Sequence, residues 1–503
     1  MISIDEQRET DTEIHSRYIY RQNICKKDGN KLNITKKTSI INFKTDKKKC
    51  KLGVMLVGLG GNNGITFLSG IIANKNKITW KTKKGVKHAN YLGSITQSTC
   101  IQVGIDDNLN PVNVPFKSVI PLVEPDDIIV SGWDISKVPL NEAMERSQVL
   151  DIDLQNKLSK YLSDMPAPLP GVYYPDFIAS NQSERADNVL SGANKLDHLH
   201  KVSKDIKQFK ETHGLDKVVV LWTANTEKMV ELQKDVHYEP DDIMNAVSNN
   251  SKFISPSMIY ALAAIKEECV FLNGSPQNTI VPAIIKMAEN KGSFIGGSDF
   301  KSGQTKIKSM LSDFFISTGI KVNAVSSYNH LGNNDGLNLS SDPQFKSKEI
   351  SKSSVMTDSQ LSNPILYSSP DDDIEQCVVI KYIKETGDTK IAMDEWINQI
   401  FMSGEQRLVT YATGEDSLLA VPLMYDMVLL AELLTRVKYT NIRNTQYKSL
   451  PSIMKLLSFC FKAPLNDKNN TCNVMYKQLN NLCKFVLILN GLDTSDIVME
   501  DFI

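Results

Sequence analysis

The chain has 503 residues, of which 41% are hydrophobic, and its formal net charge is −1. This length is too great for one ordinary hydrophobic core, so we expect two domains. The near-zero charge gives no bulk electrostatic reason to expect binding to nucleic acid or to an anionic membrane. The 8 cysteines lack the spacing of a zinc or redox motif, which is typical of reduced thiols in a cytoplasmic protein.

The first strand is predicted over residues 54–57, after a polar N-terminal extension over 1–51 that lacks the apolar core of a signal peptide. A glycine-rich turn over 58–64 follows and leads into a helix over 65–72. Glycines let the backbone approach a pyrophosphate, and the N-terminus of the next helix stabilises its charge. We therefore predict a dinucleotide site at this turn.

This glycine turn departs from the common G-x-G-x-x-G motif in two ways. Its last glycine falls one place later, and the acid expected about 20 residues on is missing. Lysines at 81, 83 and 84 stand there instead and would, taken alone, favour NADP. Asp134, at the end of a strand over 128–134, is a substitute acid for NAD; the alternative is that it caps a helix over 140–150.

Further apolar runs lie at 218–222, 269–272 and 295–298, and each ends in small polar residues. This pattern is typical of buried parallel strands with ligand-binding loops at their carboxyl ends. Helical periodicity covers residues 140–162. These features predict an α/β, Rossmann-type domain.

The pattern changes after residue 301. We expect a helix over 305–318, a strand over 321–326, an extended polar stretch to about 375 and a strand over 377–383. This order indicates an α+β layer that interrupts the first domain. The apolar run over 418–434 carries Pro422, Asp426 and Glu432, so it is interpreted as a buried helix rather than a membrane span.

The stretch over residues 300–352 is dense in lysines, amides and small hydroxyls. Backbone N–H groups of residues 302–305, at the start of the expected helix, would form an anion site, and Lys306 and Lys308 add positive charge. Lys348 and Lys352 are four residues apart and would share a face of a helix, where a bound anion would offset their repulsion. The alternative is a solvated basic face. We expect residues 341–375 to become ordered around ligand.

Motifs along nearly the whole chain resemble the inositol-3-phosphate synthase family. They are LGVMLVGLGGNNG (52–64), LWTANTE (221–227), NGSPQNT (273–279), DFKSGQTKIKS (299–309), SYNHLGNNDGLNLS (327–340), SKEISKS (347–353), GDTK (387–390), EDSLLA (415–420) and FKAPL (461–465). The resemblance implies an NAD-dependent isomerase that converts glucose 6-phosphate to inositol phosphate, the first step of inositol and phosphatidylinositol synthesis. The reaction is oxidation at carbon 5, enolisation, closure of carbon 6 onto carbon 1, and reduction.

The resemblance also implies a division of the chain and an assembly. The expected parts are an NAD-binding Rossmann-type domain over 1–301, a catalytic and tetramerisation α+β domain over 302–416, and a return to the first domain over 417–503. The family's members are homotetramers joined through the central sheet. We predict no metal site.

Four lysines match the family's catalytic positions: Lys348, Lys352, Lys390 and Lys462. We hypothesise that Lys348 and Lys462 polarise the carbon 5 oxygen and that Lys352 and Lys390 bind phosphate or move protons, because a crowded or buried lysine has a lowered pKa. The predicted phosphate turn comprises Ser302, Gly303, Gln304 and Thr305. The implied cofactor residues are Gly58, Gly60, Gly61, Asn62, Asn63, Asp134, Gln182, Arg185, Thr223, Ala224, Asn225, Thr226, Gly274, Ser275, Asp299, Ser302, Asn333, Asn334, Asp335, Lys348, Asp388, Asp416 and Ser417.

Some of these residues have structural alternatives. Asp416 and Ser417 could cap the helix that follows them, and Asp335 could be a turn residue. Two functional alternatives also stay open. A sugar-phosphate dehydrogenase would accumulate NADH, and a non-catalytic NAD-binding scaffold would bind ligand without turnover.

Overall fold

The computed structural model describes residues 8–360, 362–369, 372–441, 446–465 and 475–492. Its central element is a six-stranded parallel sheet with the strand order β10-β9-β4-β11-β12-β13. The strands are β4 (Leu52–Val57), β9 (Ile129–Asp134), β10 (Leu169–Pro170), β11 (Lys217–Trp222), β12 (Val270–Asn273) and β13 (Ile295–Gly297). This sheet confirms the predicted Rossmann-type fold.

Both faces of the parallel sheet are buried. Val219 and Leu221 of β11 point into one hydrophobic cluster, while Val218 and Val220 point into another on the opposite face. Successive strand residues face opposite sides, so a strand covered on both faces is apolar throughout. Helices α6 (Lys195–His213) and α9 (Pro256–Lys266) supply the second cluster, and α1 (Asn62–Lys75) belongs to the first.

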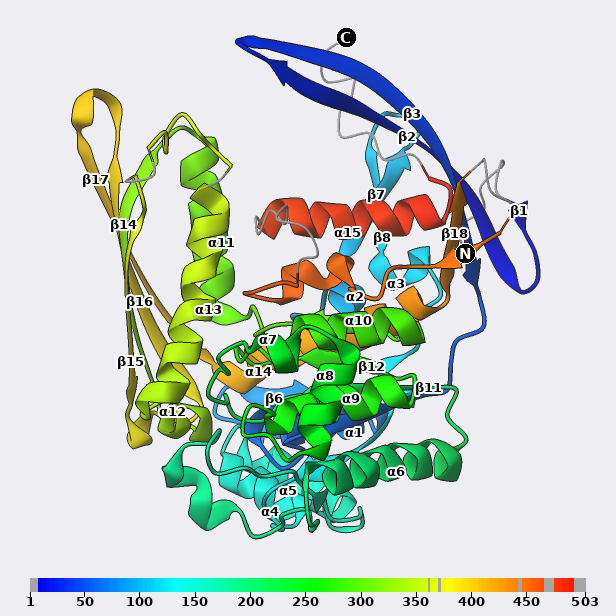
Figure 1. Ribbon diagram of the computed structural model, residues 1–503, viewed down its shortest axis with the longest axis vertical. Helices are drawn as coiled ribbons and strands as arrows, with labels where there is room; N and C mark the ends of the chain where they lie inside the picture. The colour runs from blue at the N-terminus through cyan, green and yellow to red at the C-terminus, as the bar shows by residue number, and fades with distance from the viewer. Residues whose placement is uncertain (1–7, 361, 370–371, 442–445, 466–474, 493–503) are drawn as a thin grey trace.

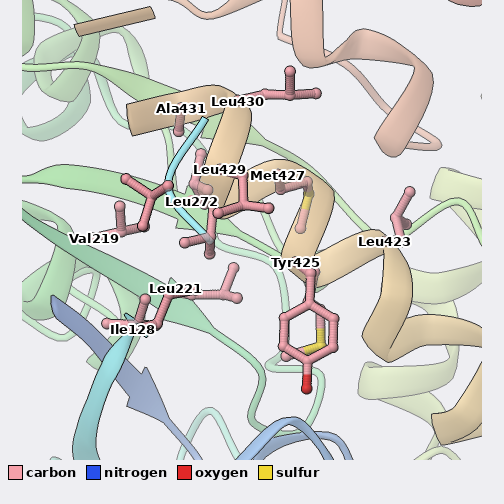
Figure 2. Packing of buried hydrophobic residues seen from close by; sticks show 14 of the residues in the cluster. Ile128, Val219, Leu221, Leu272, Leu423, Tyr425, Met427, Leu429, Leu430 and Ala431 are labelled. Carbon is pink, nitrogen blue, oxygen red and sulfur yellow. The ribbon is translucent and has the colours of Figure 1, made fainter. Parts of the chain in front are cut away.

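Helix α14 (Asp416–Thr435) packs against the first face of the sheet. Figure 2 shows Leu429 of this helix beside Leu272 of β12. Among the described residues, α14 is the one helix long and apolar enough to cross a membrane, and 83% of its most apolar window is buried inside the protein. The core helix of a globular protein has these same properties, which agrees with the predicted buried helix.

A second, four-stranded sheet has the order β15-β14-β16-β17. Its strands are β14 (Lys321–Leu331), β15 (Glu375–Tyr382), β16 (Thr389–Gln399) and β17 (Glu405–Glu415). Figure 1 shows helices α11 (Gly303–Ser317) and α13 (Asp342–Gln360) standing between this sheet and the parallel-sheet domain. Phe315 of α11 packs on Trp396 of β16 in a separate small core, as expected for an α+β layer.

The N-terminal segment forms a long hairpin that the sequence analysis treated only as a polar extension. Strands β2 (Glu13–Asp28) and β3 (Lys31–Asp46) pair along their whole length. Strand β3 then pairs with β18 (Val437–Asn441), so the hairpin joins a five-stranded sheet with β1 (Arg8–Glu9) and β19 (Lys448–Ser449). Helix α15 (Met475–Leu489) packs on its base through Phe485 and Phe43.

Two predicted elements were wrong. Residues 140–162 form two helices, α4 (Leu140–Ser147) and α5 (Ile152–Ser163), because Gln148 adopts a left-handed conformation with φ of 51° and ends the first one. The stretch before residue 375 is also not extended. It contains α12 (Asn334–Asn338) and the long helix α13, whose inner face is polar and gives no hydrophobic period.

The remaining elements of the described chain are short helices and strands, and they include two hairpins, β5-β6 and β7-β8. They are β5 (Thr79–Thr82), β6 (Gly85–His88), α2 (Ile95–Ser98), β7 (Cys100–Ile105), β8 (Pro111–Pro115), α3 (Phe116–Val119), η1 (Pro125–Asp127), η2 (Ser180–Arg185), α7 (Lys234–His237), α8 (Pro240–Ser248), α10 (Pro282–Lys291), η3 (Lys384–Thr386), η4 (Phe401–Ser403) and η5 (Lys455–Cys460).

Candidate active site

A cleft lies where the carboxyl ends of the parallel strands meet α13 and the start of α14. It is lined by Gly61, Asn62, Asn63, Arg185, Thr223, Ala224, Asn225, Thr226, Gly274, Ser275, Asp299, Phe300, Ser302, Asn333, Asn334, Asp335, Lys348, Lys390, Asp416, Ser417, Ala420 and Lys462. Of these lining residues, the sequence analysis missed Phe300 and Ala420. The predicted site residues behind the lining are Gly58, Gly60, Asp134, Gln182, Gly303, Gln304, Thr305, Lys352 and Asp388.

Two glycines of the turn, Gly58 and Gly64, lie where a side chain does not fit. Gly58 has a φ of +91°, and a Cβ there would lie 2.8 Å from the Ala224 Cα. A Cβ on Gly64 would lie 2.3 Å from the Gly58 carbonyl oxygen. Helix α1 starts directly after Gly61 without a side-chain cap, so its first-turn N–H groups are available beside the cleft. A pyrophosphate fits this arrangement.

Asp134 braces the glycine turn. Its Oδ2 accepts a hydrogen bond from the Gly60 N–H at 2.8 Å, and its Oδ1 accepts one from the Ser136 N–H at 2.9 Å. Burial raises the pKa of Asp134, although these N–H groups and the nearby Arg185 favour the charged form. Helix α4 begins after Pro139, so the alternative that Asp134 caps this helix is wrong.

A row of amides continues from the turn toward α12. Arg185 Nη1 and Asn225 Nδ2 each donate to Gln182 Oε1 at 3.2 Å. Asn334 Nδ2 in turn donates to Asn225 Oδ1 at 3.2 Å. Gln182 is fully buried, so it orients the two cleft residues from behind them.

Asp388 links the glycine turn to the residues that precede α12 and to the start of α14. It accepts hydrogen bonds from Asn62 Nδ2 and Asn333 Nδ2, both at 3.1 Å, and from the Ser417 N–H at 2.9 Å. These partners begin or precede helices α1, α12 and α14. The side chain of Asp416 does not cap α14, which leaves it facing the cleft, where it accepts a hydrogen bond from Lys390 at 3.4 Å.

Asp299 is the centre of the lysine cluster. Its Oδ1 accepts hydrogen bonds from Lys348 Nζ at 2.9 Å and from Lys462 Nζ at 3.1 Å, and its Oδ2 accepts one from Ser351 Oγ at 2.7 Å. Burial alone would raise the pKa of Asp299, but the two ammonium groups hold it well below its usual range. The sequence analysis missed Ser351, which lies between the two α13 lysines on the same buried face.

The two lysines that share Asp299 have different proton affinities. Burial opposes the charge of Lys348, but Asp299, Asp335 and Asp416 outweigh it and raise the pKa of Lys348 above its ordinary value. Burial, reinforced by the charges of Lys348 and Lys390, lowers the pKa of Lys462 to about 7. At neutral pH, Lys348 is therefore a fixed cation, and Lys462 can exchange a proton.

Lys352 lies one helical turn after Lys348. Its side chain is 5% exposed, and its Nζ has no hydrogen-bond partner among the described residues. Burial and the charges of Lys390, Lys462, Lys348 and Lys308 lower the pKa of Lys352 well below its ordinary value. A bound anion would stabilise the protonated form of these lysines, so the cluster favours an anionic ligand. This geometry excludes the alternative of a solvated basic face.

The predicted phosphate turn lies at the edge of the lysine cluster. Helix α11 begins at Gly303, and Ser302, its N-cap residue, has no side-chain cap bond and lines the cleft. The Gln304 side chain turns away and donates to Asp394 at 2.8 Å, so its amide nitrogen is not available to a phosphate. Lys308 is buried and donates to Ser327 Oγ, outside the cleft lining.

Together, the Rossmann-type fold, the glycine turn and the lysine cluster define a dinucleotide-dependent enzyme for an anionic substrate. A family model described as myo-inositol-1-phosphate synthase, an NAD-binding family, matches residues 52–486. This chain belongs to that family, whose members are NAD-dependent isomerases of a sugar phosphate.

Individual relatives agree with this assignment over nearly full length. The inositol-3-phosphate synthase of Saccharomyces cerevisiae is 44% identical, covering 97% of this chain and 94% of its own length. Inositol-3-phosphate synthase 1 of Bos taurus is 46% identical, covering 92% of this chain and 83% of its own length. The crystal structure of inositol-3-phosphate synthase from Caenorhabditis elegans superposes with a TM-score of 0.97 at 46% identity and covers 100% of this chain and 98% of that chain.

Proposed function

We propose that this chain converts glucose 6-phosphate to 1D-myo-inositol 3-phosphate in the cleft between its two sheets. The observation that carries the proposal is the convergence of Lys348 and Lys462 on Asp299, with Lys352 buried close to both lysines, in the cleft that the glycine turn also lines. When bound, NAD supplies a hydride acceptor for carbon 5 and returns the hydride after ring closure. The protein supplies charge, orientation and proton transfer.

The residues of the cleft fit NAD. The tight glycine turn and the uncapped start of α1 would hold the pyrophosphate through backbone N–H groups. Asp134 keeps acceptor capacity for a ribose hydroxyl beyond its two backbone bonds, since each carboxylate oxygen can accept more than one hydrogen bond. An acidic side chain at this position favours NAD over its phosphorylated form, because it would repel the additional phosphate.

Lys348 and Lys462 would act together on the carbon 5 oxygen but in different roles. Oxidation at carbon 5 requires loss of the hydroxyl proton, and a lysine with a pKa of about 7 is suited to accept it. Lys348 stays protonated and would stabilise the negative charge that develops on the oxygen. Asp299 holds both nitrogen atoms at one point, which fixes their positions relative to the substrate.

Lys352 and Lys390 would bind the phosphate and move protons during enolisation. The unpartnered Nζ of Lys352 is the group whose charge a substrate phosphate would stabilise most. Lys390 is held by Asp416 at the same cleft. The backbone of the Ser302 turn offers additional N–H donors at the start of α11.

The segment over residues 302–416 would also join subunits of a homotetramer. The four-stranded sheet exposes Met393, Val409 and Tyr411 at 41%, 56% and 68% of their full surface. Exposed apolar side chains on a sheet support contact with another copy of the chain. Light scattering on the purified protein should give the mass of four chains.

A cytoplasmic location agrees with the cysteines of the described residues, all of which are free thiols.

Product analysis tests the proposed reaction. The purified protein should be incubated with glucose 6-phosphate and NAD, and its products separated by chromatography and identified by mass spectrometry and ³¹P NMR. We expect an inositol phosphate without net NADH. NADH formed in proportion to substrate consumed would instead indicate a dehydrogenase, and NAD binding without any product would indicate a scaffold.

A further inference from the structure

A second pocket lies between helices α1 and α14, away from the lysine cluster. Its volume is about 320 Å³. Thr66, Ser69 and Ala73 of α1 form one wall, and Val421 and Pro422 of α14 form another. This volume is large enough for a small organic ligand.

The rim of this pocket is acidic. Asp151, at the start of α5, and Glu415, at the end of β17, are its charged lining residues, and among the described residues that line it none is lysine or arginine. The two carboxylates affect one another, because burial and then Asp151 raise the pKa of Glu415. A cation between them would relieve this repulsion.

Aromatic and apolar side chains make up much of the rest of the lining, together with Thr66, Ser69, Asn74 and Asn90. Trp80 stands beside Asp151 and donates to it through Nε1 at 2.7 Å. Deeper in the pocket, the rings of Tyr91 and Tyr425 meet edge to face at 5.2 Å. Aromatic rings beside carboxylates are a favourable environment for an organic ammonium group.

Two hydroxyl groups at the base of the pocket have no hydrogen-bond partner in the described structure. Thr66 is 3% exposed and Ser69 is 0% exposed, and both residues line the pocket. A buried hydroxyl without a partner is costly to the fold. A ligand with a hydrogen-bonding group at its inner end would satisfy them.

We propose that this pocket binds a small amphipathic organic cation. Its ammonium group lies beside Asp151 and Glu415, and its apolar body packs along Leu154 and Val421. The rim supplies charge and the walls supply apolar contact. The site is separate from the lysine cluster, which repels cations.

Occupancy of this pocket affects the candidate active site, because the same two helices wall both. Asn62 and Asn63 at the start of α1, and Ser417 and Ala420 of α14, line the active-site cleft. A cation beside Glu415 reduces the negative charge near Asp388, which raises the affinity for anionic ligands such as NAD. This part of the inference depends on the proposed function; the binding itself does not.

Calorimetric titration of the full chain with 2-(4-hydroxyphenyl)ethylammonium, whose phenol can reach the two buried hydroxyls, tests the inference. We expect saturable binding, much weaker binding of the neutral isostere 2-(4-hydroxyphenyl)ethanol, and a loss of about fivefold or more in affinity for the cation in the Asp151→Asn, Glu415→Gln double variant. The matched control is Glu145→Gln, Asp164→Asn, which removes the same charge from exposed sites outside the pocket. Its affinity for the cation should equal that of the wild type.

Three results would overturn the assignment: no saturable binding, equal binding of the alcohol, or equal affinity in both double variants. A second titration measures NAD affinity with the cation at saturation, where we expect at least about twofold tighter binding; unchanged or weaker binding refutes the coupling. A chain that binds the cation but makes no inositol phosphate contradicts the proposed function alone.

Discussion

Lys348 and Lys462 donate hydrogen bonds to the same atom, Asp299 Oδ1, at 2.9 and 3.1 Å. One lysine comes from helix α13, and the other follows η5 near the end of the chain. Two ammonium groups on one buried carboxylate cannot both be fully neutralised by it. A phosphorylated, oxygen-rich substrate would add negative charge that stabilises the protonated lysines.

Asp299→Asn should abolish turnover and lower the stability of the fold. The substitution leaves two buried lysines without their shared carboxylate, so we expect the free energy of unfolding at neutral pH to fall by about 3 kcal/mol. Because the pKa of Asp299 is lowered in the fold, its stabilisation is present at pH values above the ordinary carboxyl pKa and is lost only in strong acid. Urea denaturation measures this difference. Asp164→Asn, an exposed control, should change stability little.

Lys352→Met should stabilise the protein while inactivating it. The pKa of Lys352 is lowered in the fold, so below its unfolded pKa the folded state binds fewer protons and loses stability. A pKa difference of one corresponds to about 1.4 kcal/mol, so the gain on substitution should exceed about 1 kcal/mol at neutral pH. Thermal unfolding at pH 7 checks this expectation.

Lys346→Met is the matched control for this variant, because Lys346 lies on the exposed face of the same helix. It should leave both melting temperature and turnover near wild-type values. A Lys352→Met protein that melts lower than wild type would show that the ammonium group has a stabilising partner in the empty site.

The rate should depend on the ionisation of Lys462. If its neutral form accepts the carbon 5 proton, kcat/KM rises with pH through the pKa of about 7. Lys462→Arg keeps the charge but cannot lose a proton in this range, so the rise should vanish and the rate fall by about 100-fold or more. Lys346→Arg should keep the wild-type pH profile. A Lys462→Arg variant with the same inflection would assign the ionisation to another group.

Gly64→Ala should disrupt the cofactor turn. The added Cβ would meet the Gly58 carbonyl oxygen at 2.3 Å, so the turn must shift. We expect NAD affinity to fall at least tenfold, about 1.4 kcal/mol, and the melting temperature to decrease. Gly104→Ala, where an added Cβ meets no atom within 4 Å, is the control. Unchanged NAD binding in Gly64→Ala would mean that this turn does not contact the cofactor.

The parts of the fold that sequence predicts well are those set by local chemistry. The run from Leu52 to Gly64 predicts a buried strand, a glycine turn and a helix, and the structure contains all three. Helix α14 is equally clear from the sequence, because a long apolar run in a globular protein is typical of a buried core helix. These segments also contain motifs that identify the family.

Helix α13 escaped prediction because its buried face is polar. Ser347, Lys348, Ser351 and Lys352 all point inward, so the segment has no hydrophobic period for a reader to find. The reason for the helical spacing of its buried polar residues is visible only in the structure, where Lys348 and Ser351 both contact Asp299. Functional burial of charge is a common reason for such a failure.

Long-range polar links could not be deduced from spacing either. Asn62 and Asp388 form a hydrogen bond at 3.1 Å, and no local pattern connects residues so far apart in the chain. The N-terminal hairpin is similar, because much of its outer half is exposed and carries lysines on both strands. Because few of these strand residues are buried, the sequence lacks the alternation of apolar and polar residues that would indicate how the two strands pair.

The most direct test of the lysine cluster compares wild type with Lys348→Ala in two assays on the same samples. Calorimetry measures NAD affinity, and chromatography measures inositol phosphate formed from glucose 6-phosphate. The account predicts product without net NADH from the wild type, and from Lys348→Ala near-normal NAD binding with turnover reduced at least about 100-fold. Turnover at the wild-type rate in Lys348→Ala would contradict it.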